Sequence, residues 1–223
     1  MFFLPCNWPL KSQSNVLAKS EEEYMTTHQE FRNMVRAFES FTKSIASITR
    51  AAVIYPKVFA DEKYHKFYPY FDGILFTILN QSDLNFGLKY LYIQLFTGSE
   101  IEKRYCARIV ALTSYEILND HNKIIDNEFR EYVLSRIGED GFEKIKTLMK
   151  QLSEIRKNHF GVLKEIRHNT IAHKHESAIT QANIIKELNP TEIYNIGYSI
   201  FTVQMNIIKT FVGLLKYDKD PET

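Results

Sequence analysis

Apolar residues recur along this chain at intervals of three and four, the spacing that places them on one face of an α-helix. Ser20 and Glu23 form a capping box that predicts the start of a long helix. Its apolar face consists of Phe31, Met34, Phe38, Phe41, Ile45 and Ile48. A second capping box, from Ser99 to Glu102, predicts another helix. Its expected inward residues are Ile101, Tyr105, Ile109, Leu112, Tyr115 and Leu118.

The stretch between these helices is aromatic-rich and less regular. Its interruptions are Pro69, Gly73, the run Asn80–Asp83 and Gly87. Because such residues usually end helices, we expect two shorter ones, Tyr70–Leu79 and Asp83–Phe96. Beyond the second capped helix, a short helix over Asp126–Ile137 is expected to stop at Gly138.

The longest apolar stripe follows Asp140, which with Glu143 predicts a further helix start. The stripe contains Ile145, Leu148, Leu152, Ile155, His159, Val162, Ile166, Asn169 and His173. Asn189, followed by Pro190, predicts the cap of a last helix. Its inward residues are Ile193, Ile196, Ile200, Ile207, Phe211 and Leu214. Together the patterns predict an all-α fold, an up-and-down helical bundle with additional helices.

The composition agrees with one helical domain. The chain has 223 residues, of which 44% are hydrophobic and 25% charged, and its 8 Gly and 6 Pro are too few for a turn-rich β-sandwich. We assign residues 20–217 to the bundle, 1–19 to an N-terminal extension and 218–223 to a C-terminal tail. Cys6 and Cys106 make neither a disulfide framework nor a zinc ligand set. This cysteine content favours a reducing cytoplasm as the location. No apolar run could span a bilayer, so we expect no membrane contact.

Polar residues at the end of the longest stripe call for an explanation. Burying an unpaired imidazole or amide costs about 1–3 kcal/mol, so such residues either have buried partners or line a polar cleft. We interpret His159 as a core histidine with partners. Asn169 and His173 lie one turn apart on the same face and directly follow Arg167 and His168, which favours a cleft. His28, His65 and His121 are expected at surface or turn positions.

Arg167, the polar His168, four further residues and His173 resemble the R-φ-x4–6-H motif of the HEPN superfamily (higher eukaryotes and prokaryotes nucleotide-binding). The ending Ile171-Ala172-His173 is similar to abortive-infection and toxin-type members. HEPN domains are all-α bundles, and many are metal-independent ribonucleases in which two subunits form one composite site. The resemblance implies a homodimeric RNA endonuclease without metal or other cofactor, plausible as a toxin or phage-defence component with a cognate antitoxin.

The resemblance also implies a mechanism. The 2′-hydroxyl of RNA would attack the adjacent phosphorus, and the 5′-oxygen would leave. His173 would move protons, and Arg167 would stabilise the charge of the transition state. His168 and Asn169 are expected to support them.

Charge adds a weaker indication of an RNA-binding face. From Gly141 to Glu176, eight Lys and Arg stand against four Glu, a local charge of +4 in a chain of +1. A local basic face suits a binder of the phosphate backbone, although a solvated helix face has the same composition. Next to the motif, Lys164, Lys174 and His175 are the residues expected to contact RNA.

Some alternatives stay open. Six residues of an ideal helix rotate by about 240°, so Arg167 and His173 do not share a face. Either the arginine side chain wraps back, the helix is distorted near its end, or a second subunit completes the site. The alternative function is a non-catalytic HEPN-like dimer that binds nucleotide or protein, and a third is a purely structural helical dimer. A metal site is not expected, because His168, His173 and His175 do not share a face.

Overall fold

The computed structural model describes residues 68–121, 138–169 and 178–215, with shorter pieces at 29, 32–33, 35–36, 39–40, 43, 130–131 and 134–135. The chain divides into two compact units, residues 1–37 and 38–223. In the first unit the described residues are helical, and Gln29 Nε2 donates to Asn33 Oδ1 at 2.9 Å, one helical turn further along. The second unit contains the helices described below.

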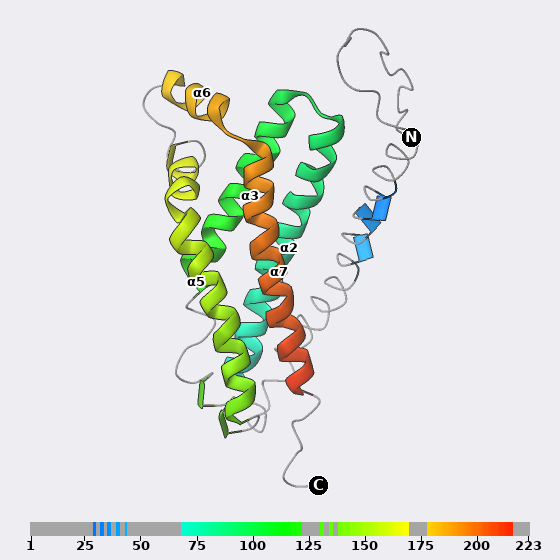
Figure 1. Ribbon diagram of the computed structural model, residues 1–223, viewed down its shortest axis with the longest axis vertical. Coiled ribbons are helices and arrows are strands. Elements are labelled where there is room, and N and C mark those ends of the chain that lie inside the picture. The colour runs from blue at the N-terminus through cyan, green and yellow to red at the C-terminus, as the bar shows by residue number, and fades with distance from the viewer. Residues whose placement is uncertain are drawn as a thin grey trace. The chain divides into compact units, whose positions relative to one another are not determined.

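The second unit is built from helices, and its described residues contain no strand, which confirms the all-α prediction. The long helices are α2 (Tyr68–Thr97), α3 (Glu100–Asp120), α5 (Glu139–Arg167) and α7 (Pro190–Leu215). They run alongside one another, with α3 in contact with the other three, while the short α6 (Ala178–Glu187) lies at one end of the bundle (Figure 1). His121, at the end of α3, contacts Ser153 of α5, whereas the earlier Glu116 contacts the later Arg167. The helices α3 and α5 therefore run in opposite directions, as in an up-and-down bundle.

The expectation of two helices between residues 70 and 96 is wrong, because α2 is a single helix of 30 residues. Gln81 and Ser82 do not interrupt the helix, because their side chains form hydrogen bonds within the bundle. The Ser82 hydroxyl donates to the Ile78 carbonyl at 3.0 Å, and Gln81 Nε2 donates to the Phe201 carbonyl on α7 at 3.1 Å. Gly87 lets α3 approach, since a Cβ there would lie 3.1 Å from Val110 Cγ2.

Helix ends follow the sequence signals closely. The Ser99 hydroxyl accepts from the backbone N–H of Glu102, whose carboxylate accepts from the Ser99 N–H, so the predicted capping box is present. The Asn189 side chain accepts from the N–H groups of Thr191 and Glu192 at the start of α7. Gly138, with φ of 82°, precedes α5 in a conformation that favours glycine.

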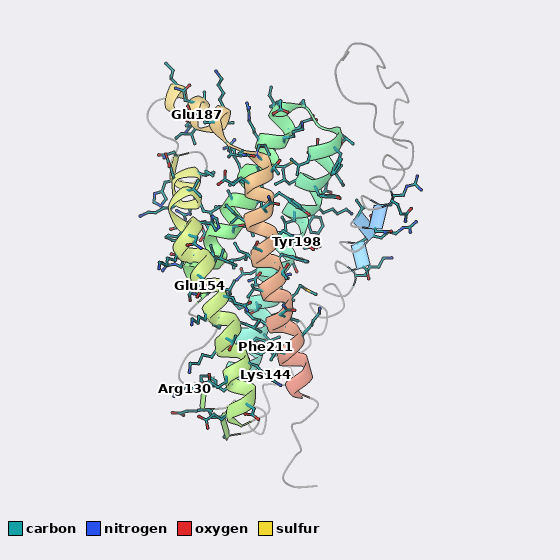
Figure 2. The ribbon with its side chains drawn as sticks, in the orientation of Figure 1. Arg130, Lys144, Glu154, Glu187, Tyr198 and Phe211 are labelled. Carbon is teal, nitrogen blue, oxygen red and sulfur yellow. The ribbon has the colours of Figure 1, made fainter. Side chains whose placement is uncertain are left out.

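The core lies where α2, α3, α5 and α7 meet, and α7 contributes the face that its pattern predicts. Ile193, Ile196, Ile200, Ile207 and Phe211 are all buried. Phe211 and Tyr198, both labelled in Figure 2, differ accordingly, since Phe211 is fully buried and Tyr198 is half-exposed. The predicted inward face of α3 is partly wrong, since Ile101, Tyr105 and Ile109 are exposed. Ala107, Val110, Ala111 and Ser114 are buried in their place.

Candidate functional site

The helix α5 brings the first residues of the motif to one end of the bundle. Arg167 is its last residue, and the backbone then widens into a π-helical turn at His168 and Asn169. All three side chains are half-buried, while Lys164 is exposed. Single π turns inside helices are frequent at functional sites. His173, Lys174 and His175 lie outside the described residues.

Arg167 is held from two directions by α3. Its Nε donates to Glu116 Oε1 at 2.7 Å, with the two side chains 25% and 41% exposed. Its guanidinium carbon lies 4.9 Å from the centre of the Tyr115 ring, within cation–π distance. Because Nε is used by Glu116, the terminal NH2 groups are the donors left for an anion.

Tyr115 connects Arg167 to a second cation further along α5. The ring of Tyr115 stacks with Phe160 at 4.9 Å, and Arg156 lies over Phe160 with its guanidinium carbon 4.5 Å from the ring centre. His168 meets the Tyr115 ring edge-on at 6.3 Å. Arg156, Phe160, Tyr115 and Arg167 therefore form a continuous series of ring and cation contacts between α3 and α5.

A pocket of about 490 Å³ opens beside this series, between the end of α3 and the middle of α5. Its lining residues are His121, Ser153, Arg156, Lys157, Phe160 and Gly161. None of them is acidic. Arg156 and Lys157 make no ion pair in the described part of the chain, and Arg156 Nε is buried without a hydrogen-bond partner. The recess is therefore lined by two cations and no carboxylate.

His121 closes one side of the pocket. Of the expected surface or turn position, the turn is correct, since His121 caps the end of α3, but the surface is wrong, because only 2% of the residue is exposed. Its Nδ1 lies 2.8 Å from the Leu118 carbonyl oxygen and its Nε2 3.2 Å from Ser153 Oγ. Burial lowers the pKa of His121 below its ordinary 6.5, and the positive charge of Arg156 lowers it further, whereas the hydrogen bond to Leu118 acts in the opposite direction.

These two hydrogen bonds decide how the protons are arranged. A carbonyl oxygen can only accept, so Nδ1 of His121 carries a proton and donates to Leu118. In the neutral ring Nε2 is an acceptor, and the Ser153 hydroxyl donates to it. When the ring is protonated, Nε2–H donates to Ser153, whose hydroxyl then donates to the Met149 carbonyl, 3.0 Å away. Protonation of His121 thus reverses the Ser153 hydrogen bond.

The expectation that His159 is a core residue is wrong. It is half-buried and faces a separate recess of about 440 Å³ beside the first turns of α7, lined by Asn189, Asn195 and Ser199 among others. Within the described ranges, no three His, Cys, Asp or Glu side chains gather in a way that could hold a metal ion. Over the same residues, no helix combines the length and the apolar character that crossing a membrane requires.

Comparisons with protein families, with curated proteins and with solved structures find no match for this chain. The motif and the contacts between α3 and α5 are therefore the basis of the function proposed below.

Sequence reasoning identified Arg167, His168 and Asn169 but missed the residues of α3 and α5 that surround them. Tyr115 belongs to the expected inward face of α3 and is buried. Nothing in the local sequence of Tyr115, Glu116 or His121 indicates, however, that they meet α5. Arg156 could have been found, because it precedes Arg167 by eleven residues. Eleven residues make about three turns, so the two arginines share a face of α5.

Proposed function

We propose that this protein is a metal-independent RNA endonuclease of the HEPN type that acts as a homodimer, in the role of a toxin or phage-defence component. The observation that carries the proposal is the fixed position of Arg167. It is the first residue of the motif, and it is held by Glu116 and Tyr115 with its terminal NH2 groups left as donors. A pre-positioned guanidinium suits the stabilisation of a pentacoordinate phosphorane.

In this mechanism the 2′-hydroxyl attacks the adjacent phosphorus, the bond from phosphorus to the 5′-oxygen breaks, and a 2′,3′-cyclic phosphate forms. His173 accepts the proton of the 2′-hydroxyl and supplies a proton to the leaving 5′-oxygen, because an imidazole titrates near neutral pH. Arg167 donates to the non-bridging oxygens as charge develops on them. His168 and Asn169 orient the phosphate or the imidazole, and Lys164, Lys174 and His175 contact the RNA backbone.

The π turn at His168 and Asn169 bears on the separation of Arg167 and His173 around the helix. The calculated rotation of about 240° assumes ideal α-helical geometry up to His173. That geometry ends at Arg167, because the next two residues are π-helical. A distorted helix end therefore supports one of the explanations for the mismatch, and completion of the site by the second subunit is the other.

The decisive experiment incubates the purified protein with a defined single-stranded RNA in the presence of EDTA. We expect cleavage that leaves 2′,3′-cyclic phosphate ends, and resistance of substrates with 2′-deoxy or 2′-O-methyl groups at the cut site. Arg167→Ala and His173→Ala should abolish cleavage, whereas His159→Ala serves as the matched histidine control outside the motif. Arg167→Lys should also be severely impaired, since an ammonium cannot replace the planar guanidinium.

Three results would contradict the proposal. Loss of cleavage with EDTA and recovery with added magnesium or zinc would indicate a metal-dependent reaction. Failure to cleave any RNA, combined with specific nucleotide binding, would favour a non-catalytic HEPN-like dimer. A strictly monomeric protein in light scattering would contradict the composite dimeric site.

A further inference from the structure

A histidine and an arginine border the same recess, His121 at the end of α3 and Arg156 on α5. We infer that His121 is an acid-sensitive switch: protonation of its ring drives Arg156 from its place over Phe160 and so loosens the hold on Arg167. The inference concerns the positions of two arginines, which can be measured whether or not the protein cleaves RNA. Its consequence for cleavage rests on the function proposed above.

The charged groups around His121 oppose a positive charge on its ring. Within the described residues, those that line the recess with it are Arg156 and Lys157, both cations of α5. On α3, the adjacent Asp120 does not line the recess, and its carboxylate accepts from Asn119 Nδ2 at 3.1 Å. A protonated His121 would therefore share the recess with two cations and no carboxylate, and like charges repel strongly where water is partly excluded.

Arg156 is the group that can give way. Its guanidinium carbon lies 4.5 Å from the centre of the Phe160 ring, but its Nε is buried and has no hydrogen-bond partner. A buried donor without a partner costs stability, so hydration of Nε would offset the loss of the cation–π contact. Arg156 is half-buried, and the nearby Gly161 is exposed with nothing within 4 Å of an added Cβ. An outward turn of Arg156 would bring Nε to water and move the charge away from His121.

The ring of His121 itself can stay in place when it gains a proton. In the neutral state the Ser153 hydroxyl donates to Nε2, and in the protonated state Nε2–H donates to Ser153, whose hydroxyl turns to the Met149 carbonyl. Because these contacts survive, the main effect of protonation is the repulsion of Arg156. The inward and outward positions of Arg156 are thus two states, and the charge of His121 shifts their populations.

Ring contacts connect Arg156 to Arg167. The Phe160 ring stacks on Tyr115 with centres 4.9 Å apart, and the guanidinium carbon of Arg167 lies 4.9 Å from the centre of the Tyr115 ring. When Arg156 leaves Phe160, both rings lose part of their packing, and Arg167 loses part of the surface on which it rests. Glu116 still accepts from Nε of Arg167, so we expect a loosened arginine that stays in the site.

The test is an NMR titration of the full-length protein from about pH 7.5 to about pH 5, a range that covers the titration of histidine. The imidazole nitrogens report the charge of His121, and the Nε–H signals report Arg156 and Arg167. In the wild type, part of each arginine shift should have the midpoint of His121. In His121→Gln that part should vanish. His159→Gln is the matched control, a half-buried histidine of α5 at another recess, and should behave like the wild type.

The Arg167 signal is the decisive one, because it lies about 16 Å further along α5 than Arg156. A change in the charge of the neighbouring His168 moves this signal in every variant, so the part that depends on His121 is the difference between wild type and His121→Gln. Arg156→Gln removes the moving group while His121 still titrates. The Arg167 signal should then no longer follow His121, whereas a direct electrostatic effect would persist. This variant also keeps the test decisive where His121→Gln fails to fold.

Cleavage gives a second readout, the ratio of the wild-type rate to that of His121→Gln at each pH. His173 titrates in both proteins, so its contribution cancels in the ratio. The ratio should be constant above pH 6.5 and fall about twofold to tenfold as the pH drops through the pKa of His121, which lies below 6.5. Such a change is a usual size for coupling through packed side chains.

An Arg167 signal that moves equally in wild type and His121→Gln would overturn the inference, and so would one that still follows His121 in Arg156→Gln. A rate ratio that does not change with pH would contradict it as well. Failure to cleave RNA at any pH would contradict the proposed function instead, and the NMR titration would still decide the switch.

Discussion

Arg167 and Glu116 join the end of α5 to α3 through a hydrogen bond of 2.7 Å from Nε to Oε1. The Glu116 carboxylate accepts a hydrogen bond from Nε, the guanidinium nitrogen closest to the arginine backbone. The Tyr115 ring lies against the guanidinium, with its centre 4.9 Å from the guanidinium carbon. The arginine is thereby fixed in orientation, while its terminal NH2 groups remain as donors. Glu116 is thus a positioning residue for Arg167.

Glu116→Ala should lower RNA cleavage far more than it lowers stability. Both side chains are partly exposed, at 25% and 41%, so the ion pair is worth less than about 1 kcal/mol. A mobile guanidinium, by contrast, should reduce kcat by about tenfold to a hundredfold with little change in KM, because small errors of position have large effects on rate. Single-turnover kinetics and urea unfolding measure the two effects.

Glu165→Ala is the matched control for this experiment. It removes the same charge from an exposed position of α5 two residues before Arg167, and we expect nearly wild-type cleavage. NMR of the Arg167 Nε–H group tests the positioning directly. Its exchange with water should be faster in Glu116→Ala than in either Glu165→Ala or the wild type. Equal exchange in all three proteins would contradict the role assigned to Glu116.

The buried face of α5 agrees only in part with the apolar stripe that the sequence predicts. A strict alternation of three and four residues repeats every 3.5 residues and drifts by about 20° per heptad from a straight helix. Ile145 and Leu152 are fully buried as expected, but Val162, further along the stripe, is 39% exposed. Leu163 is fully buried instead, because it follows Ile145 by 18 residues, about five whole turns.

The candidate site, too, could be predicted only in part from the sequence. Arg167 and its neighbours stand together in the sequence, so the motif could be recognised without a fold. The pairing of Arg167 with Glu116 spans 51 residues, and that of His121 with Ser153 spans 32. Such contacts depend on the packing of α3 against α5. The burial of His121 follows from the same packing, whereas its turn-like sequence indicated only a helix end.

Gly197→Ala should destabilise the bundle by about 1–3 kcal/mol, the usual effect of overpacking. Gly197 is buried where α7 meets α2 and α3, and a Cβ there would lie 2.7 Å from Val110 Cγ1 and 3.1 Å from Leu88 Cδ2. Gly161→Ala is the matched control. A Cβ at that exposed position of α5 meets nothing within 4 Å, so alanine should stabilise the helix by roughly 0.5–1 kcal/mol. Chemical denaturation should therefore show a lower free energy of unfolding for Gly197→Ala and a higher one for Gly161→Ala. Equal losses of stability in the two variants would contradict this account.

Gln204→Met should stabilise the protein by about 1–3 kcal/mol, which is the range measured for buried polar groups without partners. Gln204 is fully buried on α7, and neither its Oε1 nor its Nε2 has a hydrogen-bond partner. Methionine has a similar length and no amide. Gln81→Met provides the comparison, because Gln81 is equally buried but donates to the Phe201 carbonyl. Its stabilisation should be smaller, and a destabilised Gln204→Met would show that the amide is needed.

Stability should fall as the pH is lowered from above 6.5, partly because of His121. Its pKa in the folded protein lies below the ordinary 6.5, so between these two values the unfolded chain binds more protons than the folded one. The contribution of His121 is therefore complete above pH 6.5 and is lost as the pH falls through the folded pKa. Each unit of difference corresponds to about 1.4 kcal/mol. Urea unfolding at several pH values should give a weaker acid dependence for His121→Gln than for the wild type.

Arg156→Gln tests the physical cause of the shift at His121. The guanidinium opposes a positive charge on the imidazole, so its removal should raise the pKa of His121 toward 6.5, while burial still holds it below that value. Lys150→Gln changes the net charge equally, on the exposed surface of the same helix, and should leave the pKa unchanged. Two-dimensional NMR of the imidazole nitrogens gives both the pKa and the tautomer. It should show a proton on Nδ1 in the neutral ring, because the Leu118 carbonyl can only accept. A neutral ring protonated on Nε2 would contradict the proton arrangement described for His121. A pKa of His121 that is unchanged in Arg156→Gln would contradict the role of Arg156 in lowering it.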